Sequence, residues 1–303
     1  MGRALRLGLV LVLLLTAVAA CRGKGPLDLP GLEGRARGGD AGAIRELVAL
    51  LAVADNDVNG RAYKILIDLG PPAVPALMDQ VGSGDLEERE HVIAALGNLK
   101  VRQAVPAIVG VLNNRSLGRR YVAAWALGEI SDPAALPALI GALDDNDGEV
   151  RKYATRSLIK FHADGVPALL DYLPKASARG EAVAVRALGD IADKRALEPL
   201  LARVKGPNRQ EVYLALGKLR DGRAEAALVA GLGDDDWRVR MNAAMALGPL
   251  GGPTAATALR VTLGDPIHVV REWSARSLQM ITGQAVTYRN EKGEQVAPYS
   301  VYH

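Results

Sequence analysis

Few of the residue types on which enzymes and metal sites depend occur in this chain. It has one cysteine, four histidines and 4% aromatic residues. One cysteine excludes an intramolecular disulfide, and no two histidines stand at the spacing of a zinc site. With so few aromatic rings, the core has to consist of Leu, Ala and Val, which suits closely packed helices.

The sequence also lacks the motifs of common active sites. Neither GxSxG nor a phosphate-binding GxxxxGK motif occurs, and no GxGxxG follows a strand. Asp55 to Gly60 matches the first half of a calcium-binding EF-hand loop, but Leu66 stands where that loop needs a bidentate Glu. We therefore predict no catalytic residues, no bound metal, no cofactor and no small-molecule substrate.

Basic residues barely outnumber acidic residues in the chain that we expect after cleavage. The formal net charge is +3, but Arg3 and Arg6 belong to a segment that we expect to be removed, which leaves 35 basic against 34 acidic residues. The chain has no stripe of basic residues of the kind that phosphate binding requires. Nucleic acid is therefore not an expected partner.

The first twenty residues have the pattern of a secretory signal peptide. Arg3 and Arg6 precede an apolar stretch at 7–17, and small residues follow it. The apolar run is too short to cross a bilayer as a helix, which takes about 20 residues. We predict that residues 1–20 are cleaved from the chain.

Val18-Ala19-Ala20-Cys21 closes this segment and resembles the lipobox of bacterial lipoproteins. The resemblance implies cleavage before Cys21 and attachment of several lipid chains to it, which anchor a protein stably in the envelope. Arg22, where an Asp would favour the inner membrane, indicates the outer membrane, on its periplasmic or surface side. Residues 21–39, rich in Gly and Pro, are expected to form the lipidated Cys and a flexible tether.

Beyond the tether one landmark recurs: a short apolar turn that ends in Leu and is usually followed by Gly. Successive landmarks are 27 to 31 residues apart, a period typical of stacked two-helix repeats. The landmark residues are Leu69, Leu96, Leu127, Leu158, Leu188, Leu216, Leu247 and Leu278, and Gly follows six of them. We predict eight repeats over residues 40–282, with these glycines as left-handed helix caps.

The unit from Ser131 to Leu158 shows how one repeat is built. Asp132 and Pro133 form a helix start, and apolar residues recur after them at helical spacing. A polar turn at 144–148 precedes the second helix. Proline recurs within the first helices and is expected to bend them, at Pro75, Pro106, Pro137 and Pro167.

An Arg stands seven residues before the landmark Leu in six units, and these residues are Arg89, Arg120, Arg151, Arg209, Arg240 and Arg271. One interpretation is an anion-binding ladder. Because this Arg keeps phase with the core, we predict a structural ladder instead, in which each guanidinium bridges to an Asp or to backbone carbonyls of a neighbouring repeat. Ala62 in the first unit and Glu181 in a later one interrupt the pattern.

The string Val-Arg-x-x-Ala-Ala-x-Ala-Leu-Gly is clearest at 239–248, and with the other landmarks it resembles the short HEAT repeats of phycobilin-lyase-like proteins. The resemblance covers residues 40–282. It implies an all-α fold, in which two antiparallel helices per repeat stack into a right-handed superhelix and the second helices line the concave face. Such repeats serve many unrelated tasks, so the resemblance implies no single activity.

In that geometry, the residues two, five and six positions before each landmark Leu face away from the packed side. This concave row contains Tyr121, Trp125, Tyr153, Arg156, Arg186, Met241, Met245, Trp273 and Arg276. Large side chains can simply fill an inner curve, but Trp, Tyr, Arg and Met in one row are typical of protein-binding surfaces. We predict that the row binds a protein or peptide partner.

These patterns together favour a membrane-anchored, non-catalytic protein-binding scaffold in the bacterial envelope. A lyase or lyase subunit is the alternative that the resemblance suggests, although an export signal contradicts the cytoplasmic substrates of such lyases. A self-assembling structural component of the envelope is another. Residues 283–303 break the repeat and are expected to form either a capping hairpin, with Lys292-Gly293 at its turn, or a disordered tail.

Overall fold

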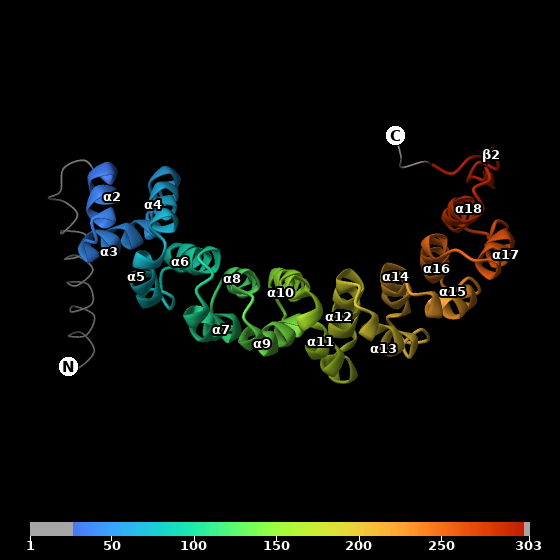
Figure 1. Ribbon diagram of the computed structural model, residues 1–303, viewed down its shortest axis with the longest axis horizontal. Helices are drawn as coiled ribbons and strands as arrows, with labels where there is room; N and C mark the ends of the chain where they lie inside the picture. Colours follow the sequence, from blue (N-terminus) through green and yellow to red (C-terminus); the bar gives the residue numbers. More distant parts are fainter. Residues whose placement is uncertain (1–26, 300–303) are drawn as a thin grey trace, which may run out of the picture. The chain divides into compact units, whose positions relative to one another are not determined.

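Most of the described chain is helical (Figure 1). The computed structural model describes residues 27–299, so the predicted signal peptide and Cys21 lie outside the described residues. The chain divides into two compact units, residues 1–76 and 77–303. Between residues 27 and 299, no helix is both long and apolar enough to cross a membrane.

The first unit holds three helices and two short 3-10 turns in its described part. These are α2 (Leu29–Arg37), α3 (Ala41–Ala49), η2 (Leu50–Ala52), α4 (Asn56–Leu69) and η3 (Pro71–Ala73). The next helix, α5 (Val74–Asp79), contains the boundary between the units.

The prediction of a flexible tether up to residue 39 is wrong for α2. Asp28 caps this helix, because its Oδ1 accepts a hydrogen bond from the backbone N–H of Gly31 at 2.9 Å. Leu29, Leu32 and Ala36 then share one face, and each is at most 5% exposed. The surrounding Gly and Pro residues hid this short apolar stripe in the sequence.

The first repeat has a different register from the predicted one. Leu66, and not Leu69, is the fully buried leucine of α4. Seven residues before Leu66 stands Asn59, so Ala62 is not the residue that replaces the ladder Arg. The amide of Asn59 donates to the carbonyl oxygen of Val53 at 3.0 Å. A polar side chain therefore occupies the ladder position in the first repeat too.

In the second unit, each repeat pairs a short first helix with a longer second helix. The second helices are α6 (Leu86–Asn98), α8 (Tyr121–Ile130), α10 (Gly148–Lys160), α12 (Ala178–Ile191), α14 (Arg209–Leu219), α16 (Trp237–Leu250) and α18 (His268–Thr282). The first helices are η4 (Arg102–Ala104) with α7 (Val105–Asn113), η5 (Pro133–Ala135) with α9 (Leu136–Gly141), η7 (His162–Asp164) with α11 (Val166–Tyr172), η9 (Lys194–Ala196) with α13 (Leu197–Leu201), η10 (Gly222–Ala224) with α15 (Glu225–Gly231), and α17 (Pro253–Thr262). Two further 3-10 turns are η6 (Ala142–Asp144) and η8 (Leu173–Lys175).

The second helices of this unit follow one another along one side, and the first helices along the other (Figure 1). The landmark Leu residues from Leu96 to Leu278 lie between the two layers and are at most 1% exposed. The prolines of the first helices occupy the second residue of α5, α7, α9 and α11. At that position a missing N–H costs nothing, so these prolines start the α-helices and the predicted bend within them is wrong.

The glycine after a landmark Leu is not a helix cap, contrary to our prediction, except for Gly70 at the end of α4. The other five lie inside second helices, where the next second helix comes very close. A Cβ added to Gly128 would stand 2.2 Å from Ser157 Oγ, and one added to Gly217 would stand 2.7 Å from Ala246 Cβ. The positive-φ residue that ends the repeat comes later, at Lys100, Ser131, His162, Ala192, Arg220, Gly251 and Gly283.

A small hairpin follows the last repeat. β1 (Tyr288–Arg289) pairs antiparallel with β2 (Gln295–Val296), and Arg271 of α18 donates to the carbonyl oxygen of Arg289 at 2.6 Å. Tyr288 is buried. Of the two alternatives that the sequence left open, the described part of the tail therefore shows the hairpin.

Candidate partner-binding surface

The ladder Arg residues are held by the turns between helices. Arg120, Arg209 and Arg240 each bind the carboxylate of an Asp that stands 25 residues further on, in the next repeat. Arg120 and Asp145 form the most buried of these pairs, with two hydrogen bonds of 2.7 and 2.8 Å and side chains that are 7% exposed. The hydrogen bonds from Arg120 hold the pKa of the Asp145 carboxyl below its usual value.

Except for Arg209, each ladder Arg also donates to a backbone carbonyl oxygen of its own repeat. Arg151 binds the carbonyl oxygen of Asp145 at 2.6 Å, and Arg271 binds that of Asp265 at 2.6 Å. Arg89 donates in the same way to the carbonyl oxygen of Ser83 at 2.7 Å. Arg151 is the exception to the predicted bridging, because it donates to carbonyl oxygens of its own turn. The other guanidinium groups join neighbouring turns and leave no open anion-binding row.

Glu181 replaces the ladder Arg with the opposite charge. Its carboxylate accepts hydrogen bonds from Arg203 Nε at 3.1 Å and from Asn208 Nδ2 at 2.7 Å. Asn208 immediately precedes α14, so the bridge between repeats survives with its polarity reversed. The Asp residues that stand four before a ladder Arg have another role, since Asp147 and Asp236 cap α10 and α16.

The residues of the concave row lie on the open face of the second helices, and all of them are partly or fully exposed. The structure brings them together in three groups. In the first, the rings of Tyr121 and Tyr153 stack with centroids 5.3 Å apart, and the hydroxyl of Tyr121 donates to Glu90 at 2.8 Å. Burial, together with this bond, raises the pKa of Tyr121 to about 12. Trp125 lies over Gly97 of the preceding second helix.

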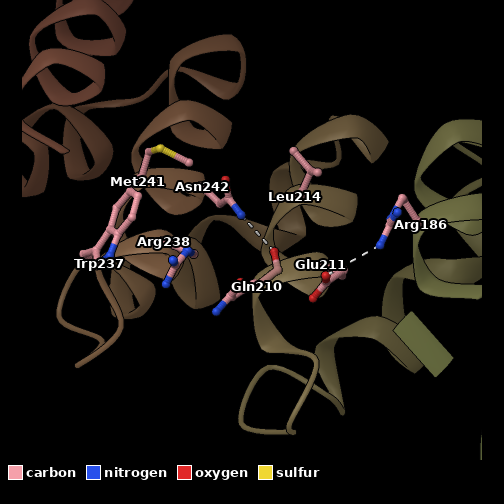
Figure 2. Close-up of a pocket in the computed structure, with 8 residues that line it drawn as sticks. All are labelled: Arg186, Gln210, Glu211, Leu214, Trp237, Arg238, Met241 and Asn242. Carbon is pink, nitrogen blue, oxygen red and sulfur yellow. Dashed lines mark hydrogen bonds and ion pairs between the residues drawn. The ribbon is translucent and has the colours of Figure 1, made fainter. Parts of the chain in front are cut away.

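The second group surrounds a pocket of about 450 Å³ (Figure 2). Three successive second helices, α12, α14 and α16, supply its walls, and the lining residues are Arg186, Gln210, Glu211, Leu214, Trp237, Arg238, Met241 and Asn242. Arg186 faces Glu211 at 3.7 Å, and the amide of Asn242 donates to the carbonyl oxygen of Gln210 at 2.9 Å. Met245 lies one turn further along α16.

The sequence identified only part of this pocket. Arg186 and Met241 were predicted, whereas Gln210, Glu211 and Leu214 were missed. The same spacing rule, applied to the unit that ends in Leu216, finds all three. Trp237 and Arg238 come before the positions on α16 that the spacing rule selects, so the row pattern does not predict them.

The third group consists of Trp273 and Arg276 on α18. The guanidinium carbon of Arg276 lies 4.8 Å from the ring centroid of Trp273. Among residues 27–299 no group of three or more His, Cys, Asp or Glu side chains is arranged to hold a metal ion. The chemistry that these three groups offer is recognition by rings, guanidinium groups and Met side chains.

The stacked two-helix repeats define an α-solenoid. A family model for HEAT repeats matches residues 74–160 and 206–279, together more than half of the chain, and a model for the PBS lyase HEAT-like repeat matches residues 182–205. The chain belongs to the HEAT-repeat family. No curated protein sequence matches it.

Several solved structures resemble the chain. Human deoxyhypusine hydroxylase is 23% identical, over 86% of this chain and 100% of that one, with a TM-score of 0.36. The complex of CpcE and CpcF of phycocyanin lyase from Nostoc sp. PCC7120 is also 23% identical, over 67% of this chain and 86% of that one, with the same TM-score of 0.36. Scores this low support no comparison of function.

The karyopherin Kap121p superposes better, with a TM-score of 0.59 at 15% identity. The match covers 79% of this chain and 34% of Kap121p, so this chain spans about a third of that protein's length. The likeness concerns the fold alone, an all-α superhelical solenoid.

Proposed function

We propose that this protein is a non-catalytic scaffold that binds another protein through the open face of its second helices. One contrast supports this proposal above all. The Arg residues in phase with the core are bound by the turns of the repeats, whereas Arg156, Arg238 and Arg276 lie over partly exposed rings on one face. Trp, Tyr, Met and Arg are the residues that protein interfaces favour.

The proposal includes a lipid anchor. Its support is the segment Val18 to Cys21 with the apolar stretch before it. Lipid on Cys21 would hold the scaffold at the bacterial envelope, and Arg22 favours the outer membrane. The binding face would then present a partner close to that membrane.

A pull-down from detergent-solubilised envelope tests the scaffold. We compare the wild-type chain with W125A/W273A and with the control Y299A, which removes an aromatic ring outside the row. Partners lost only with W125A/W273A, while its melting curve stays cooperative, support the proposal. Partners common to all three chains place the site elsewhere, and capture of none but the chain itself favours a self-assembling component.

Membrane fractionation of a C21S chain tests the lipid anchor separately. A C21S chain recovered from the membrane fraction would contradict the anchor.

A further inference from the structure

Three arginines of the open face share one arrangement. Arg156 lies over the ring of Tyr153 at 5.6 Å, Arg238 over Trp237 at 4.7 Å and Arg276 over Trp273 at 4.8 Å, each measured from the guanidinium carbon to the ring centroid. Each pair belongs to a single second helix, α10, α16 or α18. A guanidinium that stacks flat on a ring keeps the N–H donors at its edge directed outward.

The charges of these arginines are only weakly compensated. The contact from Arg238 to Asp236 is 4.0 Å long, and the Arg238 side chain is 55% exposed. In the same pocket, Arg186 approaches Glu211 at 3.7 Å and is 53% exposed. By contrast, the ladder residue Arg240 binds Asp265 at 2.7 and 3.1 Å and is 13% exposed. The open face therefore presents guanidinium N–H donors that the fold does not use in close ion pairs.

Apolar surface lies between these donors. Leu214, Trp237 and Met241 line the pocket together with Arg186 and Arg238 (Figure 2). A volume of about 450 Å³ accommodates a large side chain such as Leu or Phe. A bound residue of this kind would have a guanidinium on each side of it, on α12 and on α16.

We propose that this face takes an extended acidic peptide, in which a large apolar side chain enters the pocket and flanking Asp or Glu carboxylates meet the ring-stacked arginines. The inference rests on the proposed scaffold function and names its partner's chemistry. Planar guanidinium donors match carboxylates in a forked geometry. The arginines recur on separate helices, so one strand of peptide that crosses several repeats reaches more than one of them.

A peptide fits better than a polymer of phosphates. Glu211 places a carboxylate inside the pocket, and Met241 and Leu214 give it an apolar wall. A phosphate chain would gain nothing from the apolar wall, and nucleic acid needs many uncompensated cations. A peptide can set an apolar side chain against Met241 and direct its carboxylates to the arginines.

Fluorescence anisotropy with the full-length chain tests this inference. The probe is a fluorescein-labelled peptide in which Glu alternates with Leu and Phe, beside matched peptides that carry Gln or Lys in place of Glu. Phosphatidylglycerol vesicles provide the lipid comparison. The test variant is R238Q/R276Q, and the matched control is R102Q/R260Q, which removes two exposed charges from first helices.

We expect the acidic peptide to bind most tightly, and R238Q/R276Q to weaken its binding about tenfold, as the loss of two exposed ion pairs predicts. The control should bind as the wild type does. Equal or tighter binding of the Lys peptide would overturn the inference and leave the scaffold proposal intact. Binding of vesicles but of no peptide, lost in R238Q/R276Q, would overturn it in favour of lipid headgroups. If no peptide binds while the pull-down still recovers a partner through the row, only the acidic specificity fails.

Discussion

At the scale of single residues, arginine has two different roles in this chain. The position of each arginine relative to the core decides between them. A ladder Arg is in phase with the buried Leu. Arg120 and Arg240, for example, donate to carbonyl oxygens of their own repeat and to an Asp of the next repeat. On the open face, Arg238 and Arg276 lie over an aromatic ring of their own helix instead. Position relative to the core, rather than residue type, therefore decides whether an arginine is held by the turns of the repeats or remains on the open face.

Arg120 provides a test of the structural use. R120A leaves the Asp145 carboxylate buried without its partner, which should lower the free energy of unfolding by about 3–5 kcal/mol. Urea denaturation measures this, with R61A as the control, because Arg61 and Asp57 form an exposed pair at 3.8 Å and their loss should matter little. A midpoint for R120A that equals that of R61A would show that the buried pair does not hold the repeats together.

At the scale of helices, the close approach of neighbouring second helices explains the recurrent Leu-Gly. The landmark Leu fills the space between the helix layers, and the Gly lets the next second helix approach. The sequence predicted the repeat period and the layers correctly, because their apolar landmarks recur in phase. It predicted the wrong role for the glycines, since Leu-Gly is equally compatible with a helix end and with a close helix contact.

Substitution of two helical glycines distinguishes these roles. G128A should destabilise the protein by about 1–3 kcal/mol through overpacking against Ser157. G110A, in α7, has open space around its new methyl group and should stabilise by about 0.5–1 kcal/mol, since Ala favours a helix more than Gly does. Thermal unfolding measures both. Equal effects of G128A and G110A would contradict the close-contact explanation.

The sequence also could not show where a short apolar stripe forms a helix despite the Gly and Pro residues around it. In α2, Leu29, Leu32 and Ala36 form a helix within a segment whose Gly and Pro content is typical of a linker. Likewise, the pocket depends on Trp237 and Arg238, which precede the row positions on α16. Both features result from packing between elements, which a count along one repeat does not contain.

At the scale of the whole molecule, the ladder arginines are bound by the turns of the solenoid, whereas the arginines of the open face are not. Bridges run through the repeats from Arg209 to Asp234, from Arg240 to Asp265, and from Arg271 to the C-terminal hairpin. Because these bridges lie in the turns, residues on the open face are available to evolve toward a partner with little cost in stability. A scaffold requires this separation.

Photo-crosslinking in cells tests the central claim most directly. A photoreactive phenylalanine analogue replaces Met241 on the open face or, in a second strain, Arg260 on the first helix α17. The account predicts a discrete crosslinked partner from position 241 and none from position 260. A partner captured at 260 but not at 241 would contradict it, because binding would then occur through the opposite layer of helices.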